Sequence, residues 1–228
     1  MPTICLDAGH GGSDSGATYG SRYEKTDTLA LVLEIKKLLE EQGVKVILTR
    51  SSDVSVSLSR RCEIANNNNA DYFLSIHRNS YNSTVSGNEI WIYSKANADT
   101  TNKATSILNA VNNVVSVPNR GVKKGITGDP NSDLAINRES KMASALLELL
   151  FISNPNDNAL YDKYLYKYAV AIAKALCSIV GITYKDLNIP ATDSGKLYRV
   201  QVGAYSQKSN AEKMKQELQS KGYDAIIV

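Results

Sequence analysis

The chain has only two histidines, and each stands at the end of a segment with the pattern of a strand. His10 follows the apolar run 3–7, and His77 follows the run 72–76. In an open parallel sheet, ligands bind at the carboxyl ends of the strands, so both imidazoles are predicted to point to one rim. Glu24, at the start of a predicted helix, belongs to the same edge. Two neutral imidazoles and a carboxylate are a common catalytic zinc set that leaves a fourth position for water.

A second carboxylate, Glu148, interrupts an otherwise apolar run at 145–149. A carboxylate is costly to bury without a partner, so its place in a buried strand requires an explanation. Zinc lowers the pKa of a bound water to about 7 and polarises a bound carbonyl. Glu148 is then predicted to be the general base that passes the proton of the water to the leaving amine.

Each of these residues also has a plainer interpretation. A single histidine at a strand end is usually a hydrogen-bonded polar residue, and Glu24 alone could favour the positive end of its helix. Glu148 could pair with a cation, for which Arg138 is available. Taken together, two histidines and two acids at one rim favour the metal site.

The elements that must position these residues alternate between strand and helix. The predicted strands are 3–7, 45–49, 72–76, 89–93 and 145–149, with a short candidate at 134–136, and the predicted helices are 25–42, 58–68, 102–115 and 157–180. This alternation predicts an α/β fold class with a largely parallel sheet. The glycine-rich turn after the first strand is not a phosphate-binding loop, because G-x-G-x-x-G from Gly9 would need glycine where Asp14 stands.

Composition limits the remaining choices. The chain is 43% hydrophobic and 21% charged, and no apolar run approaches the ~18 residues that a membrane span needs. The N-terminus has no signal-peptide pattern, so we expect synthesis in the cytoplasm. Three scattered cysteines, Cys5, Cys62 and Cys177, are predicted to be buried hydrophobic residues, not a disulfide or metal set.

The C-terminal part has a different composition. We expect a catalytic domain over 1–181, a linker over 182–195 and a small strand–helix–strand module over 196–228, with strands at 197–203 and 224–228 and a helix at 206–221. The module holds six basic and three acidic residues and so carries the whole net charge of +3. A basic module suits a polyanionic partner, although this charge is mild.

The chain resembles the zinc-dependent N-acetylmuramoyl-L-alanine amidases often called amidase type 3, over about residues 3–181. The motifs that carry the resemblance are I-C-L-D-A-G-H-G-G, L-T-R-S-S-D, L-S-R-R-C-E-I-A-N, F-L-S-I-H-R-N-S and K-M-A-S-A-L-L-E-L-L-F-I-S-N-P. It implies a twisted, mainly parallel sheet with helices on both faces. It also implies one Zn²⁺ held by His10, Glu24 and His77, Glu148 as catalytic acid/base, and cleavage of peptidoglycan between N-acetylmuramic acid and L-alanine.

Three positions depart from the family pattern. Arg78 replaces a small residue, Ala143-Ser144 replaces the usual proline region, and Leu150 replaces the glycine of E-x-G-F. We expect Arg78 to meet a carboxylate of the stem peptide. Asn79 and Arg138 are further candidates for substrate binding.

The C-terminal module resembles half of a sporulation-related (SPOR-like) glycan-binding repeat. The resemblance implies wall contacts by Tyr198, Arg199, Gln201 and Tyr205. A half-repeat would leave a sheet edge uncovered, so we expect two chains to pair their modules in a homodimer. We expect peptidoglycan as the partner, with neither nucleic acid nor membrane. Release through holin pores or by mother-cell lysis would bring the protein to the wall, as in endolysins and sporulation autolysins.

Two other functions remain open at this point. A zinc peptidase on the same sheet would cut within the stem peptide and free a different amine. A non-catalytic wall-binding protein would keep the fold, but it would have no need of a buried base at Glu148.

Overall fold

The computed structural model describes residues 1–125, 132–186, 203–220 and 227. The chain forms two compact units, Met1–Lys185 and Asp186–Val228, and each is described by itself. None of the helices in these ranges combines the length and apolar character that crossing a membrane requires.

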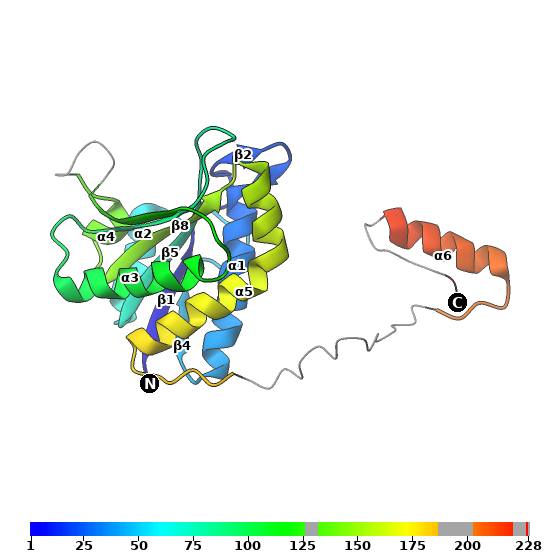
Figure 1. The fold of residues 1–228 in the computed structure, drawn as a ribbon. Coiled ribbons are helices and arrows are strands. Elements are labelled where there is room, and N and C mark those ends of the chain that lie inside the picture. Colours follow the sequence, from blue (N-terminus) through cyan, green and yellow to red (C-terminus); the bar gives the residue numbers. More distant parts are fainter. Residues whose placement is uncertain (126–131, 187–202, 221–226, 228) are drawn as a thin grey trace. The chain divides into compact units, whose positions relative to one another are not determined.

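The first unit is built on one six-stranded sheet in the order β4-β1-β5-β8-β6-β7 (Figure 1). All neighbouring pairs are parallel except β6 and β8, which confirms the predicted α/β fold with a mainly parallel sheet. The strands are β1 (Thr3–Ala8), β4 (Lys45–Leu48), β5 (Tyr72–Asn79), β6 (Asn88–Ile92), β7 (Asn119–Lys124) and β8 (Ser144–Phe151), and β2 (Thr18–Tyr19) pairs with β3 (Arg22–Tyr23) in a separate hairpin.

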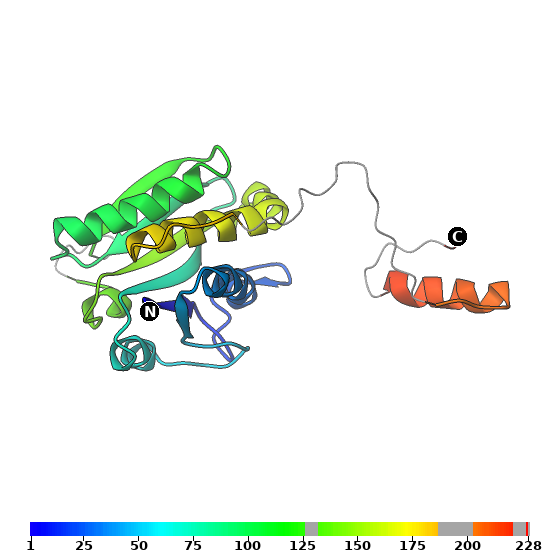
Figure 2. The ribbon, with the colours of Figure 1, turned by 90° about the horizontal axis from the view of Figure 1, so that it is seen from below.

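Five helices cover the two faces of the sheet (Figure 2). They are α1 (Glu24–Glu41), α2 (Leu58–Asn67), α3 (Ala98–Asn112), α4 (Ala135–Arg138) and α5 (Pro155–Ile179). Alternate residues of the strands pack against α1, α3 and α5 in the larger core, and residues such as Cys5 and Phe73 pack against α2 and α4 in a smaller one. All three cysteines are buried and free, as predicted.

Two parts of this unit differ from the sequence prediction. The candidate strand at 134–136 is wrong: the segment forms the short helix α4, whose buried Ile136 packs beside Cys62 and Phe73. Three apolar-leaning residues are too few for periodicity to separate a strand from a helical turn. The prediction also missed β7, because the segment N-R-G-V-K-K is basic and does not alternate between apolar and polar residues. An exposed edge strand can carry such a charged sequence.

The segment after α5 begins on the surface of the first unit. Ile182 and Tyr184 pack against its core, and Lys185 exchanges two hydrogen bonds with the Gln42 side chain. The first residues of the predicted linker therefore belong to this unit. In the second unit, α6 (Lys208–Ser220) agrees with the predicted helix, whereas the two predicted strands fall almost entirely outside the described residues.

Candidate active site

The loop that follows β1 carries the first histidine. His10 has a left-handed backbone (φ 62°), and the chain reaches it through Gly9, whose amide donates to the Ile76 carbonyl at 3.0 Å. A Cβ at Gly9 would lie 2.3 Å from the ring of His77, so only glycine allows the two histidines to approach. The rings of His10 and His77 are 4.8 Å apart and nearly perpendicular.

Two buried arginines hold this loop by hydrogen bonds to its backbone carbonyls. Arg61 donates to the Asp7 carboxylate (2.6 Å) and to the carbonyls of Ala8 and His10 (both 2.7 Å). Arg50 donates to the carbonyls of Ala8 and Gly9, both at 2.9 Å. These charge-assisted bonds satisfy carbonyls that no strand pairs and fix the backbone of His10.

Glu24 lies between the two histidines. Its Oε2 is 3.1 Å from His10 Nε2, and its Oε1 is 2.9 Å from His77 Nδ1. The backbone amides of Ala17 and Arg78 also donate to this carboxylate, each at 2.9 Å. Glu24 is only 3% exposed, whereas both histidines are partly open to solvent. One donor atom from each of the three residues falls within 4.8 Å of the others, which is a metal-sized cluster.

Glu24 is also the first residue of α1, and this helix has no side-chain cap. Tyr23 stands at the N-cap without a side-chain hydrogen bond. The free amides of Glu24 and Lys25 donate instead to the carbonyls of Ala17 (3.0 Å) and Ser15 (3.1 Å). The start of the helix is therefore held by the same loop that carries His10.

The charges of the three residues are strongly coupled. Burial opposes ionisation of Glu24, but hydrogen bonds with His10 and His77 hold its pKa well below the usual range. Burial works against a charged His10, yet Glu24 and Asp14 raise its pKa to about 9. Burial likewise opposes a charged His77, and Glu24 raises its pKa. The carboxylate thus favours positive charge between the two rings, which is the environment that suits a bound cation.

Asp14 is a site residue that the sequence analysis missed. Its Oδ2 is 2.8 Å from His10 Nδ1, and its Oδ1 accepts from the Gly16 amide at 3.0 Å. A carboxylate on one ring nitrogen orients a histidine so that the other nitrogen faces a metal. The sequence contained a signal for it, a carboxylate four residues after His10 in the same loop.

Glu148 lies one strand away from the histidines. It pairs with His77 across β5 and β8 and with Glu89 across β8 and β6, so the three side chains share one face of the sheet. Its side chain is partly exposed, but Oε2 is buried and has no hydrogen-bond partner among the residues that the structure describes. Burial raises the pKa of Glu148 to about 7, and the negative charges of Glu24 and Glu89 add to this. An acid with this pKa can take up and release a proton near neutrality.

The strand bends immediately after this residue. The pairing of β5 with β8 shifts register between His77 and Asn79, and Leu150 has a left-handed backbone at φ 60°. The Leu150 amide donates to Asn88 Oδ1 at 3.0 Å. This is the position where the sequence departs from a family glycine, and glycine adopts this conformation without strain.

The structure does not support the role expected for Arg78. This residue is 2% exposed and points to the face opposite His77, where it forms an ion pair with Asp27 and donates to Asn158 at 2.7 Å. Its guanidinium also lies 4.2 Å from the ring centroid of Tyr161. Arg78 is therefore a buried link between α1, β5 and α5, and a substrate carboxylate cannot reach it.

The other expected binding residues lie in different surroundings. Asn79 is partly exposed at the end of β5, two residues after His77, and its side chain accepts from the Ser80 amide at 2.8 Å. Arg138 pairs with Glu139 and donates to the Asp133 carbonyl, so it is not engaged as the partner of Glu148. Tyr205 is 41% exposed in the second unit. Tyr198, Arg199 and Gln201 lie outside the described residues.

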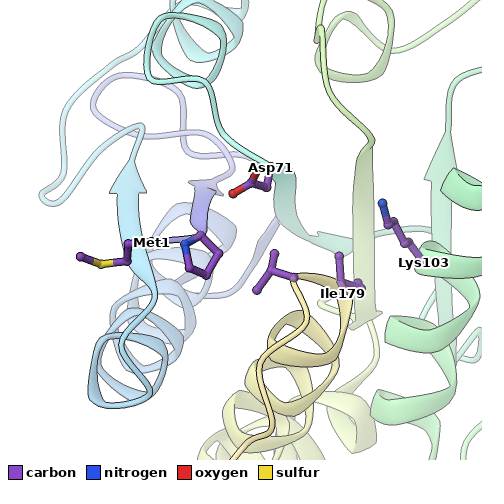
Figure 3. A pocket seen from close by; sticks show the side chains of 6 residues that line it. Met1, Asp71, Lys103 and Ile179 are labelled. Atoms are coloured by element: carbon purple, nitrogen blue, oxygen red, sulfur yellow. The ribbon is translucent and has the colours of Figure 1, made fainter.

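A separate hollow of about 540 Å³ opens at the other end of the strands (Figure 3). Met1 and Pro2, which precede β1, line it together with Asp71, which precedes β5. The candidate site follows the opposite ends of these two strands, so this hollow has no part in it.

A carboxylate between two histidines, with a second acid one strand away, is an arrangement typical of metal-dependent hydrolases and stands here at the edge of an open α/β sheet. Comparison with protein families identifies the particular group. Residues 4–178 match the model of N-acetylmuramoyl-L-alanine amidase (Amidase_3), and residues 194–228 match the SPOR domain. The chain belongs to the N-acetylmuramoyl-L-alanine amidase family.

Individual relatives agree with this assignment. The chain is 37% identical over 232 residues to the sporulation-specific N-acetylmuramoyl-L-alanine amidase of Bacillus subtilis, covering 100% of this chain and 85% of that protein. It is 35% identical over 190 residues to the endolysin of Bacillus phage SPP1, and the match covers 80% of this chain and 67% of that protein. The catalytic domain of CwlV, an amidase of Bacillus (Paenibacillus) polymyxa, superimposes with a TM-score of 0.73 at 28% identity, covering 80% and 100%.

Proposed function

We propose that the protein hydrolyses the amide bond between N-acetylmuramic acid and L-alanine in peptidoglycan, using one zinc ion held by His10, Glu24 and His77. The observation that carries the proposal is the position of Glu24, whose two oxygens each face a different histidine. Family membership supplies the substrate, and the site supplies residues suited to the reaction.

The donor set fits a zinc ion. Two imidazoles and one carboxylate are typical ligands of catalytic zinc, and the partly open histidines leave access for a substrate. Asp14 would orient His10, as a carboxylate commonly does behind a zinc-bound histidine. Zinc in such a site polarises a carbonyl and activates water for attack.

The protein's own groups would then handle the proton. Glu148 Oε2 accepts no hydrogen bond from the described part of the chain, and burial raises the pKa of Glu148 to about 7. The carboxylate can therefore accept a proton from the attacking water and deliver it to the leaving nitrogen of L-alanine. The arginines beneath the loop keep His10 in place during this exchange. Glu148 acts on the face that it shares with His77.

The test is digestion of purified cell walls with and without a chelator. We expect new N-terminal alanine that disappears with chelator, returns with zinc and is lost in Glu148→Ala. Glu63→Gln, which removes an exposed carboxylate on α2, is the matched control and should retain activity. Amines from another residue would identify a peptidase instead, and new reducing sugar ends would mean that a glycosidic bond is cut.

We further propose that the SPOR-matching segment contributes to wall binding. Pairing of two such segments in a homodimer remains a prediction, which light scattering of the full chain can test. A monomer that still binds walls through this segment would contradict the pairing and leave the binding role intact.

A further inference from the structure

Two basic side chains lie on the edge of the sheet near Glu148. Arg120 and Lys123 belong to β7, and their side chains are 34% and 32% exposed. Lys123 pairs in register with Trp91 of β6. Directly paired residues point to the same face of a sheet, so Lys123 shares the face of Trp91 and of Glu89, two residues earlier in β6.

This face connects the basic residues to the candidate active site. His77, Glu148 and Glu89 form a row across β5, β8 and β6. Arg120 Nε and Lys123 Nζ each donate to Glu89 Oε2 at 2.7 Å. Neighbouring strands are about 4.8 Å apart, so the two head groups lie roughly 5 to 10 Å from Glu148 along the row. An extended peptide covers about 3.3–3.6 Å per residue, and this distance corresponds to two or three residues.

Neighbouring aromatic rings and Glu89 hold Arg120 and Lys123 in place without using all of their N–H donors. The Lys123 ammonium lies 5.0 Å from the ring centroid of Trp91, and the Arg120 guanidinium lies 5.1 Å from that of Phe151. Trp91 also donates to Glu89 Oε1 at 3.0 Å, which fixes the shared carboxylate. Among the described residues, Arg120 donates only through Nε, and the two terminal nitrogens of its planar guanidinium have no partner there.

The group formed by Glu89, Arg120 and Lys123 carries one more positive than negative charge. Glu89 is one carboxylate and is 4% exposed, whereas its two cationic partners are each about one-third exposed. One buried negative charge therefore serves two cations that face solvent. Such an arrangement favours an incoming anion, and a guanidinium binds a carboxylate through two parallel hydrogen bonds.

We infer that Arg120 and Lys123 form a subsite that binds a carboxylate of the peptide part of the substrate, two or three residues from the cleaved bond. This inference rests on the proposed amidase function. The sugar chain of peptidoglycan is uncharged apart from modifications, whereas its peptides carry free carboxylates, so a cationic subsite favours the peptide side. The role that the sequence analysis gave to the buried Arg78 thus passes to these two exposed residues.

The test compares two soluble muramoyl tripeptides that differ only in having free or amidated peptide carboxylates. For the zinc-loaded protein we expect a kcat/KM about tenfold higher on the acid, the effect of one partly exposed charge-assisted hydrogen-bonded pair. Most of the difference should fall on KM, because a remote carboxylate is bound equally in the ground and transition states. The double variant Arg120→Gln/Lys123→Gln should bring the ratio near one.

The matched control is Lys124→Gln, which removes the same charge from the next residue of β7. Lys124 is exposed and donates to the Ala96 carbonyl, away from Glu89, so its variant should keep the tenfold preference. The single variants Arg120→Gln and Lys123→Gln each leave Glu89 one cation and provide a second measurement if the double variant unfolds.

A double variant that keeps the preference for the acid would overturn the inference. Equal loss of preference in Lys124→Gln would also overturn it, because the effect would then reflect general charge. If the wild-type protein cleaves neither compound, the proposed function fails. Calorimetric binding of the same two compounds then decides the subsite separately: equal affinity for acid and amide refutes it, and tighter binding of the acid that depends on Arg120 supports it.

Discussion

Replacing Glu148 with glutamine should remove activity and yet make the metal-free protein more stable at alkaline pH. The pKa of Glu148 rises from 4.5 to about 7 on folding, because burial disfavours the charged form. A group with a raised pKa contributes its full share of stability below pH 4.5, and this contribution is lost as the pH rises through 7. Glutamine has nearly the same shape and no charge, so it avoids this loss.

The structure gives the size of the effect. The rise of the Glu148 pKa from 4.5 to about 7 corresponds to an upper limit of roughly 3 kcal/mol at high pH. Because the side chain is partly exposed, solvent screening reduces this, and we expect about 1–2 kcal/mol in favour of Glu148→Gln at pH 9. At pH 4 the two proteins should differ by only a few tenths of a kcal/mol, since Glu148 is then mostly protonated in both states.

Urea unfolding in the presence of chelator at pH 4, 7 and 9 measures this difference. Glu63→Gln is the control, since Glu63 is exposed and its ion pair with Arg60 on α2 is solvated. Wall digestion by Glu148→Gln with zinc restored should fall at least about 100-fold, the usual contribution of a general base. Two results would refute the reasoning that burial of Glu148 raises its pKa. One is a variant that is less stable than wild type at pH 9, and the other is a variant whose free energy of unfolding differs from wild type by the same amount at all three pH values.

Three further changes test other parts of the site. Asp14→Asn should weaken zinc binding about 10- to 100-fold in a competition titration, because His10 loses the carboxylate that orients it. The control Ser13→Ala should bind zinc as tightly as wild type. Equal affinities of Asp14→Asn and wild type would contradict the orienting role of Asp14. Leu150→Gly should be more stable than Leu150→Ala by about 1 kcal/mol in urea unfolding, the reverse of the usual order, because φ is 60° there; alanine as the more stable variant would argue against this backbone conformation. Arg78→Ala should lower the free energy of unfolding by about 2 kcal/mol, because Asn158 loses its buried donor and Asp27 keeps only its ion pair with Arg22. KM should be unchanged in the folded protein, and a raised KM at full stability would restore the substrate role.

The sequence was sufficient to predict a mainly parallel sheet and to identify four candidate site residues, although it missed β7. His10 and His77 were identifiable because histidines are scarce and both follow apolar strand patterns. Glu148 was identifiable because a carboxylate is costly inside an apolar run. The family motifs agreed with all four predicted site residues, and the structure brings three of them together in one cluster.

The orientation of Arg78 and the position of β7 became clear only from the structure. Arg78 follows His77 directly, and alternation along a strand already puts neighbours on opposite faces. The error was to end the strand before them, whereas β5 continues to Asn79. The basic edge strand β7 has no apolar period, so neither its existence nor the placement of Arg120 beside Glu89 could be read from local pattern. Such contacts depend on strand order, which the sequence does not state.

The missing cap of α1 has a consequence for how the molecule moves. The first amides of this helix are held by carbonyls of the loop that carries His10, and its first side chain is Glu24. Fraying of the first turn would therefore release Glu24 and the 15–17 part of the loop in one event, while Arg50 and Arg61 still hold the backbone at Gly9 and His10. An ion that joins His10 to Glu24 would act as a staple at the end of the helix, and hydrogen exchange at the amides of Glu24 and Lys25 should slow when it binds. The state of the metal site would then be readable in the backbone dynamics of α1.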